Sequence, residues 1–498
     1  MLISGLALGA VLGFVMQRGR FCVTGFLRDI FTQRSWRGFV ALLIVISVHA
    51  IGLAALTSAG VITPEYNELA PVAVIVGGVI FGLGIVLAGG CASGTWYRSG
   101  EGLIGSWIAL VFYALSAAAM KTGFLNGLQN SLKDRTVGLT SIHASLGISI
   151  WPLVIALSSV TAYFAVRFLR EEFSGPRPVT LAPRKSGLAH ILAEKPWHVY
   201  ATAAIVGTLG VLAWPLSAAT GRNDGLGITT PSSNLANYVV TGDTERFDWG
   251  VLLVLGILVG SFIAAKASGE FRLRVPDATQ GARSVVGGIF MGVGAAWAGG
   301  CTVGNGMVQT SLFSYQGWLA LASIAAGVAI AAKLWLKPSA PSLSDVPSTP
   351  STTNDPAVSA TAPVASAATS PVSLPGSEGA GAGAGAAGTE ASPLAGSFAV
   401  APVALLDRSV VKQEDGKLKP LGGGRYELDT VGAVCPFPLI EAKDAINKIE
   451  VGEELVIPFD CTQATDAIPR WAAKDGHEVT NFEQTGEAGW TISVRRGR

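Results

Sequence analysis

Apolar residues gather in long stretches along the first two thirds of the chain. A helix needs about 20 predominantly apolar residues to cross the hydrocarbon core of a bilayer. About nine stretches approach that length. They predict membrane-spanning helices near 1–17, 38–60, 71–90, 102–120, 146–168, 198–219, 250–266, 284–300 and 315–336. The first, third and eighth are short and run into glycine-rich loops, which is typical of broken helices that line a protein-enclosed cavity.

The pattern changes twice after the last apolar stretch. Residues 338–423 are rich in Pro, Ala, Ser and Gly, and this composition predicts a flexible linker. From 424 to 498 the pattern is that of a small soluble α/β domain. It predicts strands at 425–431, 454–459, 478–482 and 490–495, and helices at 438–449 and 463–474.

Composition places most of this chain in lipid. Half of the 498 residues are hydrophobic and only 14% are charged, whereas an ordinary globular protein has about 25% charged residues. So few charges cannot cover the surface of a soluble protein, which excludes a cytosolic enzyme. The net charge of +1 gives no basic field for DNA or RNA, so no nucleic-acid partner is expected. The chain is therefore predicted to be a polytopic α-helical membrane protein, with lipid as a partner, that carries a small α/β domain.

Basic residues in the loops predict the orientation of the spans, because cytoplasmic loops are enriched in Lys and Arg. The loops after the first, fifth and seventh spans are basic, whereas the loop between the second and third holds Glu65 and Glu68. Nine spans then place the N-terminus outside and the C-terminal domain in the cytoplasm. Lys121, Lys133 and Arg135 fall on the outer side and oppose this pattern.

Two segments of the chain repeat each other. Residues 77–91 and 287–301 share their glycine spacing and both end in Ala-Gly-Gly-Cys. The predicted spans run the two copies in opposite directions, and inverted repeats with broken helices are a transporter architecture with the substrate site at their interface. Convergence of two glycine-rich packing helices is the alternative.

Three cysteines of the apolar region lie where a predicted helix breaks. Cys91 and Cys301 follow Gly90 and Gly300, and Cys22 follows a Gly-Arg-Phe turn. Backbone N–H groups at such breaks attract anions, and a thiol beside them is a soft, weak donor. The combination favours an anion with both oxygen and sulfur atoms, although a single membrane cysteine is usually only a small hydrophobe.

Positive charge along this route must come from helix ends and from arginines near the cysteine loops. The nearest in sequence are Arg18, Arg20 and Arg98, and we include Arg20 and Arg98 in the predicted pathway. The five histidines are not spaced as ligands of a metal site, so no metal is expected. No cofactor is expected either, and ATP hydrolysis is not indicated because the chain has no phosphate-binding Gly-x4-Gly-Lys-Ser/Thr loop.

Two cysteines of the C-terminal domain are the candidate catalytic residues. Cys435, in Cys-Pro-Phe-Pro, stands directly before a predicted helix, where the helix N-terminus favours the thiolate. That position suits attack on a sulfane sulfur or the carriage of a persulfide. Cys461 follows the strand at 454–459 and is either a resolving thiol or merely a buried residue. Five widely spaced cysteines do not suggest a disulfide framework.

Specific motifs relate both parts of the chain to known families. Residues 1–336 resemble the thiosulfate transporters of the YeeE/YedE sulfur-transport family, and residues 424–497 resemble the TusA family. The first resemblance rests on Gly19-Arg20-Phe21-Cys22, on Ala88-Gly89-Gly90-Cys91-Ala92-Ser93-Gly94 and on Ala298-Gly299-Gly300-Cys301-Thr302-Val303-Gly304-Asn305-Gly306. The second rests on Val434-Cys435-Pro436-Phe437-Pro438-Leu439-Ile440-Glu441-Ala442-Lys443 and on Phe459-Asp460-Cys461-Thr462-Gln463-Ala464-Thr465.

The resemblance implies a function and a role for each cysteine. It implies uptake of thiosulfate across the cell inner membrane, with Cys22, Cys91 and Cys301 passing the ion along by weak S–H contacts. In the TusA family the cysteine that matches Cys435 carries sulfur, in a two-layer sandwich fold. Cys461 stands where sulfurtransferase relatives usually have an acidic residue, which leaves its part in a sulfur relay open.

The sequence thus predicts a transporter with a tethered sulfur-handling domain. We expect that domain to dock on the transporter at the cytoplasmic side and to receive or process the sulfur compound, with cytosolic sulfur-acceptor proteins as further partners. Whether it is also an enzyme stays open. Two alternatives remain: a membrane-anchored sulfurtransferase, and a transporter of another sulfur or selenium anion.

Overall fold

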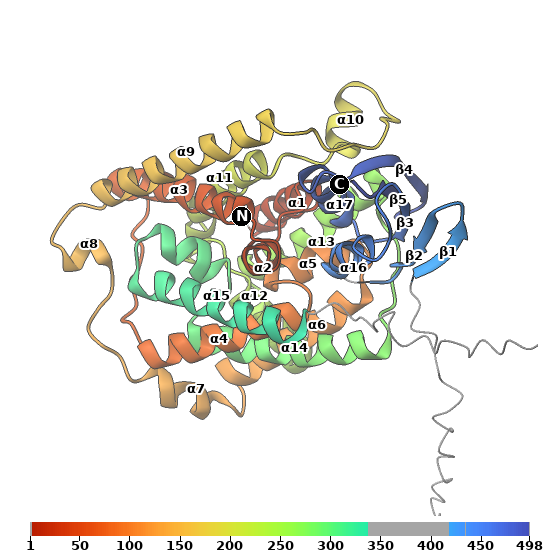
Figure 1. The fold of residues 1–498 in the computed structure, drawn as a ribbon. Coiled ribbons are helices and arrows are strands. Elements are labelled where there is room, and N and C mark those ends of the chain that lie inside the picture. The colour runs from red at the N-terminus through yellow and green to blue at the C-terminus, as the bar shows by residue number, and fades with distance from the viewer. Residues whose placement is uncertain (1, 337–417, 434, 498) are drawn as a thin grey trace, which may run out of the picture. The chain divides into compact units, whose positions relative to one another are not determined.

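The computed structural model describes residues 2–336, 418–433 and 435–497, and combines a helical part with a five-stranded sheet (Figure 1). The helical part consists of α1 (Ile3–Arg18), α2 (Val23–Thr32), α3 (Arg37–Ser58), α4 (Pro71–Leu87), α5 (Ala92–Gly100), α6 (Ile104–Lys121), α7 (Asn126–Lys133), α8 (Ile142–Ser145), α9 (Trp151–Ser174), α10 (Gly187–Ala193), α11 (Val199–Ala218), α12 (Thr229–Thr241), η1 (Thr244–Arg246), α13 (Trp249–Ser268), α14 (Ala278–Ala298), the π-helical turn η2 (Gly304–Gln309) and α15 (Tyr315–Trp335).

Among the described residues, eight helical segments have both the length and the hydropathy expected of a membrane span, against the nine predicted. They are Ile3–Thr32, Arg37–Ser58, Pro71–Gly100, Ile104–Lys121, Trp151–Ser174, Val199–Ala218, Trp249–Ser268 and Tyr315–Trp335. The predicted span that is missing from this set, 284–300, corresponds to α14. The glycines and Arg283 of this helix lower its hydropathy. The chain is nevertheless a multi-pass membrane protein, as predicted; its orientation stays a prediction.

The two repeated segments form α4 and α14, which pack closely in opposite directions. A Cβ added to Gly84 would lie 2.8 Å from the Gly287 carbonyl oxygen, and one added to Gly294 would lie 2.7 Å from the Gly77 oxygen. The two backbones touch at both ends of the contact, which only glycine permits. Because residue numbers rise along one helix as they fall along the other, the prediction of an inverted repeat is confirmed.

Other helix pairs extend the same symmetry. Glycine contacts place α4 parallel to α15 and α14 parallel to α6, since Gly82 meets Ile324 and Gly327, while Gly292 meets Tyr113 and Ser116. The helices α1 and α13 are likewise parallel, and so are α3 and α11. Each parallel pair therefore contains one helix from each repeat. The carboxyl ends of α6 and α14 lie on one side of the helical part, and the carboxyl ends of α4 and α15 lie on the opposite side.

Four connections interrupt the helices of the repeats: those between α1 and α2, α4 and α5, α11 and α12, and α14 and η2. Cys22 and Cys91 are the N-terminal cap residues of α2 and α5, and Cys301 precedes η2. The break between α11 and α12 has Ile228 as its cap residue instead. The structure thus has three breaks with a cysteine and a fourth without one.

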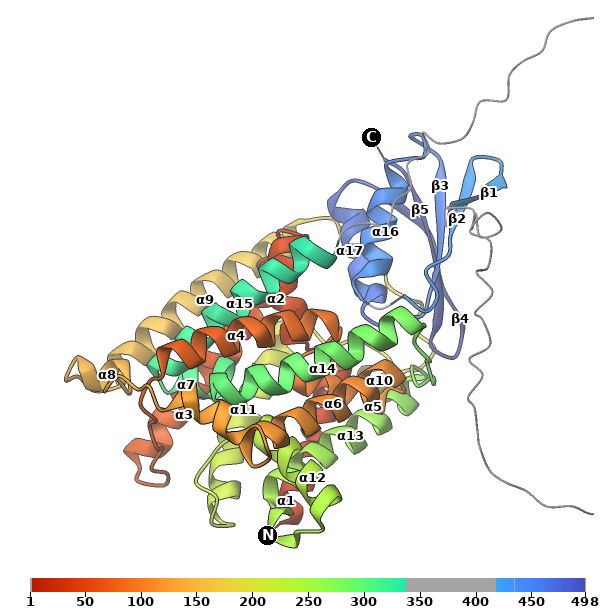
Figure 2. The same ribbon diagram turned by 90° about the horizontal axis from the view of Figure 1, so that it is seen from below.

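The C-terminal domain has two layers, with α16 and α17 on one face of the sheet (Figure 2). The strand order is β1-β2-β3-β5-β4; β2 and β3 are parallel and the other neighbours antiparallel. The bounds are β1 (Leu418–Gly422), β2 (Arg425–Leu428), α16 (Phe437–Ile446), β3 (Glu454–Phe459), α17 (Ala464–Lys474), β4 (Glu478–Gly486) and β5 (Gly489–Arg495). Alternate residues of β3 are buried, which is why its sequence reads as a strand.

One boundary of this domain differs from the prediction. The strand β1 falls within the predicted linker 338–423, yet it pairs with β2 in the sheet. The ordered domain therefore begins at least at Leu418, six residues before 424. The rest of the predicted linker lies outside the described residues.

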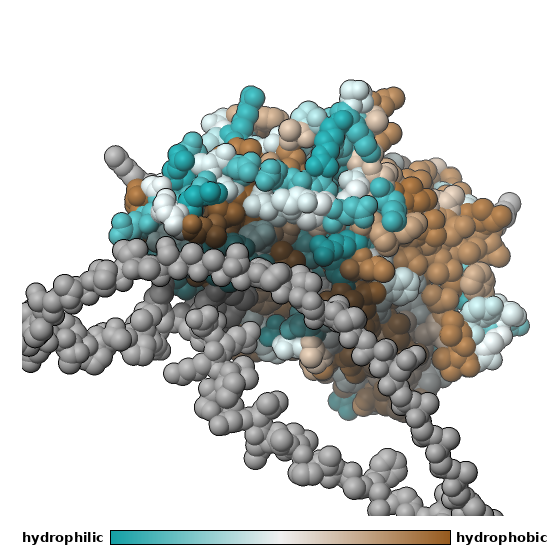
Figure 3. Space-filling model, turned by 90° about the vertical axis from the view of Figure 1, so that its right-hand side faces the viewer, coloured by the Kyte–Doolittle hydropathy of each residue, from teal (hydrophilic) through white to brown (hydrophobic). Residues whose placement is uncertain are grey.

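The surface of the helical part is rich in exposed apolar side chains. Ile155 and Tyr163 of α9 and Val259 and Ile263 of α13 are among the exposed large hydrophobic residues. Figure 3 shows a broad hydrophobic area beside a hydrophilic one on a single face of the molecule. Apolar patches of this extent are unusual on soluble proteins and fit contact with lipid.

Candidate functional site

Cys22 and Cys91 lie close together at the breaks of two different repeat helices. A Cβ built on Gly94 would lie 3.3 Å from Cys91 Sγ and 3.7 Å from Cys22 Sγ, so both sulfurs flank the first turn of α5. Both cysteines are buried and neither forms a disulfide. The Gly94 N–H donates to Cys91 Sγ at 3.4 Å, and the Ser93 hydroxyl is also within 3.4 Å of that sulfur. The Cys91 sulfur therefore caps the N-terminus of α5.

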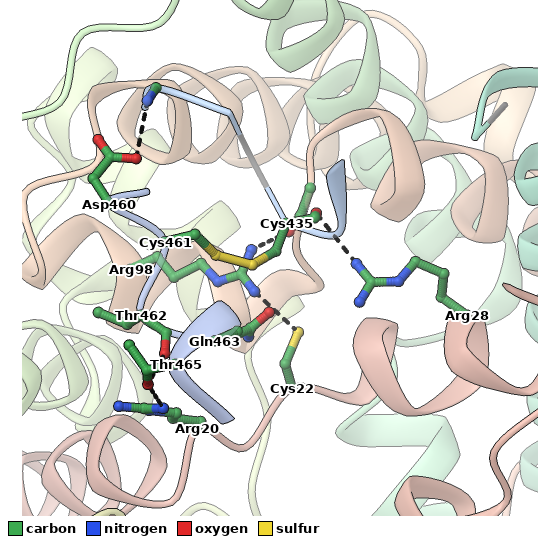
Figure 4. Close-up of a disulfide and its surroundings, with 12 residues drawn as sticks. Arg20, Cys22, Arg28, Arg98, Cys435, Asp460, Cys461, Thr462, Gln463 and Thr465 are labelled. Carbon is green, nitrogen blue, oxygen red and sulfur yellow. Dashed lines mark hydrogen bonds between the residues drawn. A yellow bond between two sulfur atoms is a disulfide. The ribbon is translucent and has the colours of Figure 1, made fainter. Parts of the chain in front are cut away.

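A buried guanidinium reaches one of these two thiols, that of Cys22. Arg98 Nη2 donates to Cys22 Sγ at 3.7 Å, and Nη1 donates to the carbonyl oxygen of Gly89 (Figure 4). The Arg98 Nε lies 3.4 Å from the Tyr97 hydroxyl. Gly90 lies directly beside this side chain, since a Cβ built on it would be in ordinary contact with Arg98 Nη1 at 3.5 Å. Arg98 thus brings a fixed positive charge to Cys22 and to the Gly-Gly-Cys loop.

The other two arginines predicted to offset substrate charge have a different partner. Arg18 Nη1 and Arg20 Nη2 each lie 3.2 Å from the buried carboxylate of Glu270, and Gln17 also donates to it. This one carboxylate offsets one of the two arginine charges, so a net positive charge remains on the group. The pairing has no local signal in the sequence, because its contacts span about 250 residues.

A second buried carboxyl, Glu101, lies near this cluster. Burial and the neighbouring Glu270 raise the pKa of Glu101 to about 7, although Arg274 and Arg98 oppose the shift. Glu101 therefore exchanges a proton near neutral pH, unlike an ordinary surface glutamate.

Cys301 occupies the corresponding break after α14. Its thiol is buried and forms no disulfide, and its carbonyl accepts from the Asn305 N–H at 2.9 Å. The Asn305 side chain donates to the carbonyl oxygens of Ala298 at 2.8 Å and Gly300 at 3.0 Å, which closes the Gly-Gly-Cys loop on itself.

A tyrosine joins the two repeats. Tyr113 is fully buried in α6. Its hydroxyl donates to Thr229 Oγ1 at 2.8 Å, across the two repeats. Sequence reasoning missed Tyr113 because a single tyrosine in an apolar span carries no signal of its position.

Hydroxyl side chains follow each membrane cysteine within two residues. They are Thr24, Ser93 and Thr302, all buried. Across the described ranges, the hydroxyls of Thr24 and Thr302 have no hydrogen-bond partner. A buried unpaired hydroxyl is costly, and these two remain available to an oxygen-bearing ligand. The recurring Cys followed by Ser or Thr is a signal that the sequence analysis could have used.

In the C-terminal domain, Cys435 and Cys461 form a disulfide across 26 residues of sequence, with Cα atoms 6.4 Å apart (Figure 4). Cys435 precedes the N-terminal cap of α16, and Cys461 follows the end of β3. The expectation of no disulfide was therefore wrong for this pair, while the three membrane cysteines stay unbridged. Two sulfurs at bonding distance can exchange between a dithiol and a disulfide.

Comparisons with known proteins match the helical part and the C-terminal domain to two different families. A family profile described as "Sulphur transport" matches residues 18–330, and one described as "Sulfurtransferase TusA" matches residues 426–496. The thiosulfate transporter TsuA of Escherichia coli (strain K12) is 51% identical over 328 residues, which cover 66% of this chain and 93% of that protein. The TsuA of Spirochaeta thermophila is 32% identical over 338 residues, covering 64% and 94%.

A different relative matches the C-terminal domain. The putative sulfur carrier protein TsuB of Escherichia coli (strain K12) is 59% identical over 70 residues, which cover 14% of this chain and 93% of that protein. Both resemblances found in the sequence are thereby confirmed.

Proposed function

Since this chain belongs to the sulphur-transport family and carries a TusA-type domain, we propose that it takes up thiosulfate across the inner membrane. The ion passes along Cys301, Cys91 and Cys22 toward the cytoplasm, where the C-terminal domain receives it. The observation that carries the proposal is the contact of Arg98 with Cys22, beside Cys91, at the helix breaks of an inverted repeat.

The physical problem for such a route is the cost of taking a dianion out of water. An unpaired buried ion costs tens of kcal/mol by Born arguments in a medium of low dielectric constant. Arg98 supplies one compensating charge, and the N–H groups at the starts of α2 and α5 supply partial charges. The thiols and the Thr24 and Thr302 hydroxyls add weak donors that hold the ion without trapping it.

Contacts with the C-terminal domain support its docking at the inner mouth. Arg28 Nη1 donates to the carbonyl oxygen of Cys435 at 3.2 Å, and Thr24 and Arg28 line one pocket together with Cys435 and Phe437. Arg28 stands six residues after Cys22 in the first broken helix. A thiosulfate that leaves Cys22 would thus meet the Cys435 sulfur next.

Charged contacts at a second place support the same arrangement. Arg470 Nη1 lies 2.7 Å from a carboxylate oxygen of Glu172, and Arg20 donates to the Thr465 hydroxyl. Each of these side chains is partly buried. The pairing aligns α17 with the ends of α1 and α9.

The disulfide suggests what the docked domain does with its substrate. In the reduced domain, the Cys435 thiolate attacks the sulfane sulfur of thiosulfate; the S–S bond of thiosulfate breaks, sulfite leaves, and Cys435 holds a persulfide. The Cys461 thiolate then attacks the Cys435 sulfur, hydrosulfide leaves, and the disulfide forms. A dithiol reductant must return both cysteines to thiols for the next turnover.

The test is uptake of radiolabelled thiosulfate by the full chain in proteoliposomes, beside Cys91→Ala and Cys301→Ala. We expect wild type to accumulate label and both variants to lose most of it at equal protein content. Full uptake by both variants would overturn the cysteine pathway. A matched control is Ser99→Ala, which changes a buried polar residue of α5 whose hydroxyl donates only to the backbone carbonyl of Thr95.

The same assay separates the two alternatives. A chain made of residues 1–336 alone should still take up thiosulfate if the helical part is a transporter. If it does not, and full-length protein merely cleaves external thiosulfate, the membrane-anchored sulfurtransferase is favoured. Competition by unlabelled selenate, sulfite or sulfate identifies a carrier for another sulfur or selenium anion.

A further inference from the structure

The loop that leads from β2 toward Cys435 is tied to the carboxyl end of β3. The parallel pairing of the two strands ends at Glu427 and Val456. Beyond that point Thr430 continues the contact, because its N–H and its hydroxyl both donate to the Pro458 carbonyl oxygen, at 3.0 and 2.9 Å. The loop therefore stays beside β3 after the regular strand pairing has stopped.

Asp460 holds this loop at a second point, directly before Cys461. The Gly432 N–H donates to Asp460 Oδ1 at 3.0 Å, a bond that spans 28 residues of sequence (Figure 4). The Asp460 side chain is buried, and a carboxylate acceptor makes such a bond roughly twice as strong as one between neutral groups. The chain neighbour of one cysteine is thereby bonded to the loop that carries the other.

The shape of the loop directs the Gly432 N–H outward to this acceptor. The Ala433 N–H donates to the Thr430 carbonyl oxygen at 3.1 Å, which closes a four-residue turn. Gly432 is the third residue of the turn and has φ +82°, a left-handed conformation that a glycine adopts without steric cost. The turn and the carboxylate together bring the following chain, with Cys435, back to the end of β3.

We propose that Asp460 is a positioning residue for the two cysteines of the C-terminal domain. Its bond to Gly432 keeps the Cys435 loop beside Cys461, so that each sulfur is held within reach of the other. A pair that is held in this way reacts at a high effective concentration. Asp460 therefore stabilises the disulfide relative to the two thiols.

The consequence for turnover rests on the proposed function. In that chemistry the Cys461 thiolate attacks the Cys435 sulfur of the persulfide. The bond between Cys461 and Cys435 forms as the persulfide S–S bond breaks, and hydrosulfide leaves with the electron pair of that bond. Because Asp460 holds the two cysteines together, it also accelerates this step.

The experiment measures the midpoint potential of the Cys435–Cys461 pair in the full-length protein in detergent. The protein is equilibrated with graded ratios of reduced to oxidised dithiothreitol and quenched with acid. Free thiols are then alkylated, and mass spectrometry of the Cys435 peptide gives the reduced fraction. Asp460→Ala should lower the equilibrium constant for disulfide formation about tenfold, because a hydrogen bond to a charged group is lost. For a two-electron couple this raises the potential by about 30 mV.

Three further variants separate positioning from charge and from folding. Asp460→Asn keeps an oxygen that can accept from the Gly432 N–H, so its potential should stay closer to wild type than to Asp460→Ala. Asp429→Ala is the matched control, because Asp429 is an exposed carboxylate of the same loop that accepts from the Val431 N–H two residues on. Its potential should stay near that of wild type.

Gly432→Ala tests the other partner of the bond. A Cβ on Gly432 would meet no atom within 4 Å, but φ of +82° is strained for alanine. The turn should therefore shift and the potential should rise, as in Asp460→Ala. If Asp460→Ala does not fold, this variant decides, and an unchanged potential overturns the proposal.

The remaining outcomes are equally decisive. A wild-type potential in Asp460→Ala overturns the positioning role, and so does an equal rise in Asp429→Ala. A rise in Asp460→Asn as large as that in Asp460→Ala also overturns it, because the charge and not the bond to Gly432 would then be responsible.

Release of hydrosulfide from thiosulfate by the reduced protein tests the proposed function separately. It should be about tenfold slower in Asp460→Ala than in wild type, in parallel with the equilibrium constant. If wild type releases none, the proposed thiosulfate chemistry fails. The redox titration, which contains no thiosulfate, still decides on Asp460.

Discussion

Arg98 Nη2 lies 3.7 Å from Cys22 Sγ, although 76 residues separate them in sequence. The same guanidinium donates through Nη1 to the Gly89 carbonyl, next to the loop that carries Cys91. A planar fork can hold both acceptors at once, whereas an ammonium group presents a single point charge. Arg98 therefore connects two helix breaks from different parts of one repeat.

Arg98→Lys is expected to lower thiosulfate uptake at least about tenfold while the protein still folds. The charge remains, but one of the two contacts is lost, so the Cys22 thiol and the Gly89 loop are no longer fixed together. Initial uptake rates in proteoliposomes measure the effect. Arg167→Lys on the exposed face of α9 is the control, and a rate for Arg98→Lys equal to that control would contradict the prediction.

Glycine contacts between α4 and α14 predict that two glycine-to-alanine substitutions in α14 have very different effects on stability. A Cβ on Gly294 would lie 2.5 Å from the Phe81 backbone nitrogen, whereas a Cβ on Gly281 meets nothing within 4 Å. Gly294→Ala should therefore destabilise the folded protein by about 1–3 kcal/mol. Gly281→Ala should leave stability unchanged or raise it by up to about 1 kcal/mol, because alanine favours helix.

Thermal unfolding of both variants in detergent measures this difference. A lower Tm for Gly294→Ala together with an equal or higher Tm for Gly281→Ala is the expected result. Equal Tm values for the two variants would mean that the helices separate more easily than their close packing indicates.

The features that could be predicted from the sequence are those that depend on neighbouring residues. The apolar stretches, the repeat that ends in Cys91 and Cys301, and the strand Glu454–Phe459 each follow from patterns of neighbouring residues. The strand Leu418–Gly422 escaped prediction because it is short, mostly exposed, contains a proline and adjoins a low-complexity segment.

Contacts between distant residues could not be predicted in the same way. The Glu270 carboxylate pairs with both Arg18 and Arg20, and only the packing of α1 against α13 brings these side chains together. The disulfide of Cys435 and Cys461 likewise depends on how α16 crosses the end of β3. Long-range packing, not residue type, decides both.

Glu101 predicts a pH dependence of stability. Its pKa is raised to about 7 in the folded protein, by burial first and by Glu270 next, and an unfolded glutamate has a pKa near 4.3. The stabilisation from this group is thus complete below the unfolded pKa and is lost as pH rises through about 7. We expect Tm in detergent to fall between about pH 5 and about pH 8 in wild type, and to fall less in Glu101→Gln.

Glu65→Gln provides the control for this comparison, because Glu65 is exposed. That variant should keep the pH dependence of wild type. Identical pH slopes for wild type and Glu101→Gln would show that another group is responsible.

The Cys435–Cys461 pair predicts a trapped intermediate. In Cys461→Ser no second thiol can attack a persulfide on Cys435, so the persulfide should accumulate when reduced protein meets thiosulfate. Intact-protein mass spectrometry should then find one added sulfur atom on Cys461→Ser and none on Cys435→Ser, and release of hydrosulfide should fall in both. Hydrosulfide release at the wild-type rate from Cys461→Ser would mean that an external thiol resolves the persulfide. Cys461 would then have only a structural role, as the disulfide partner of Cys435.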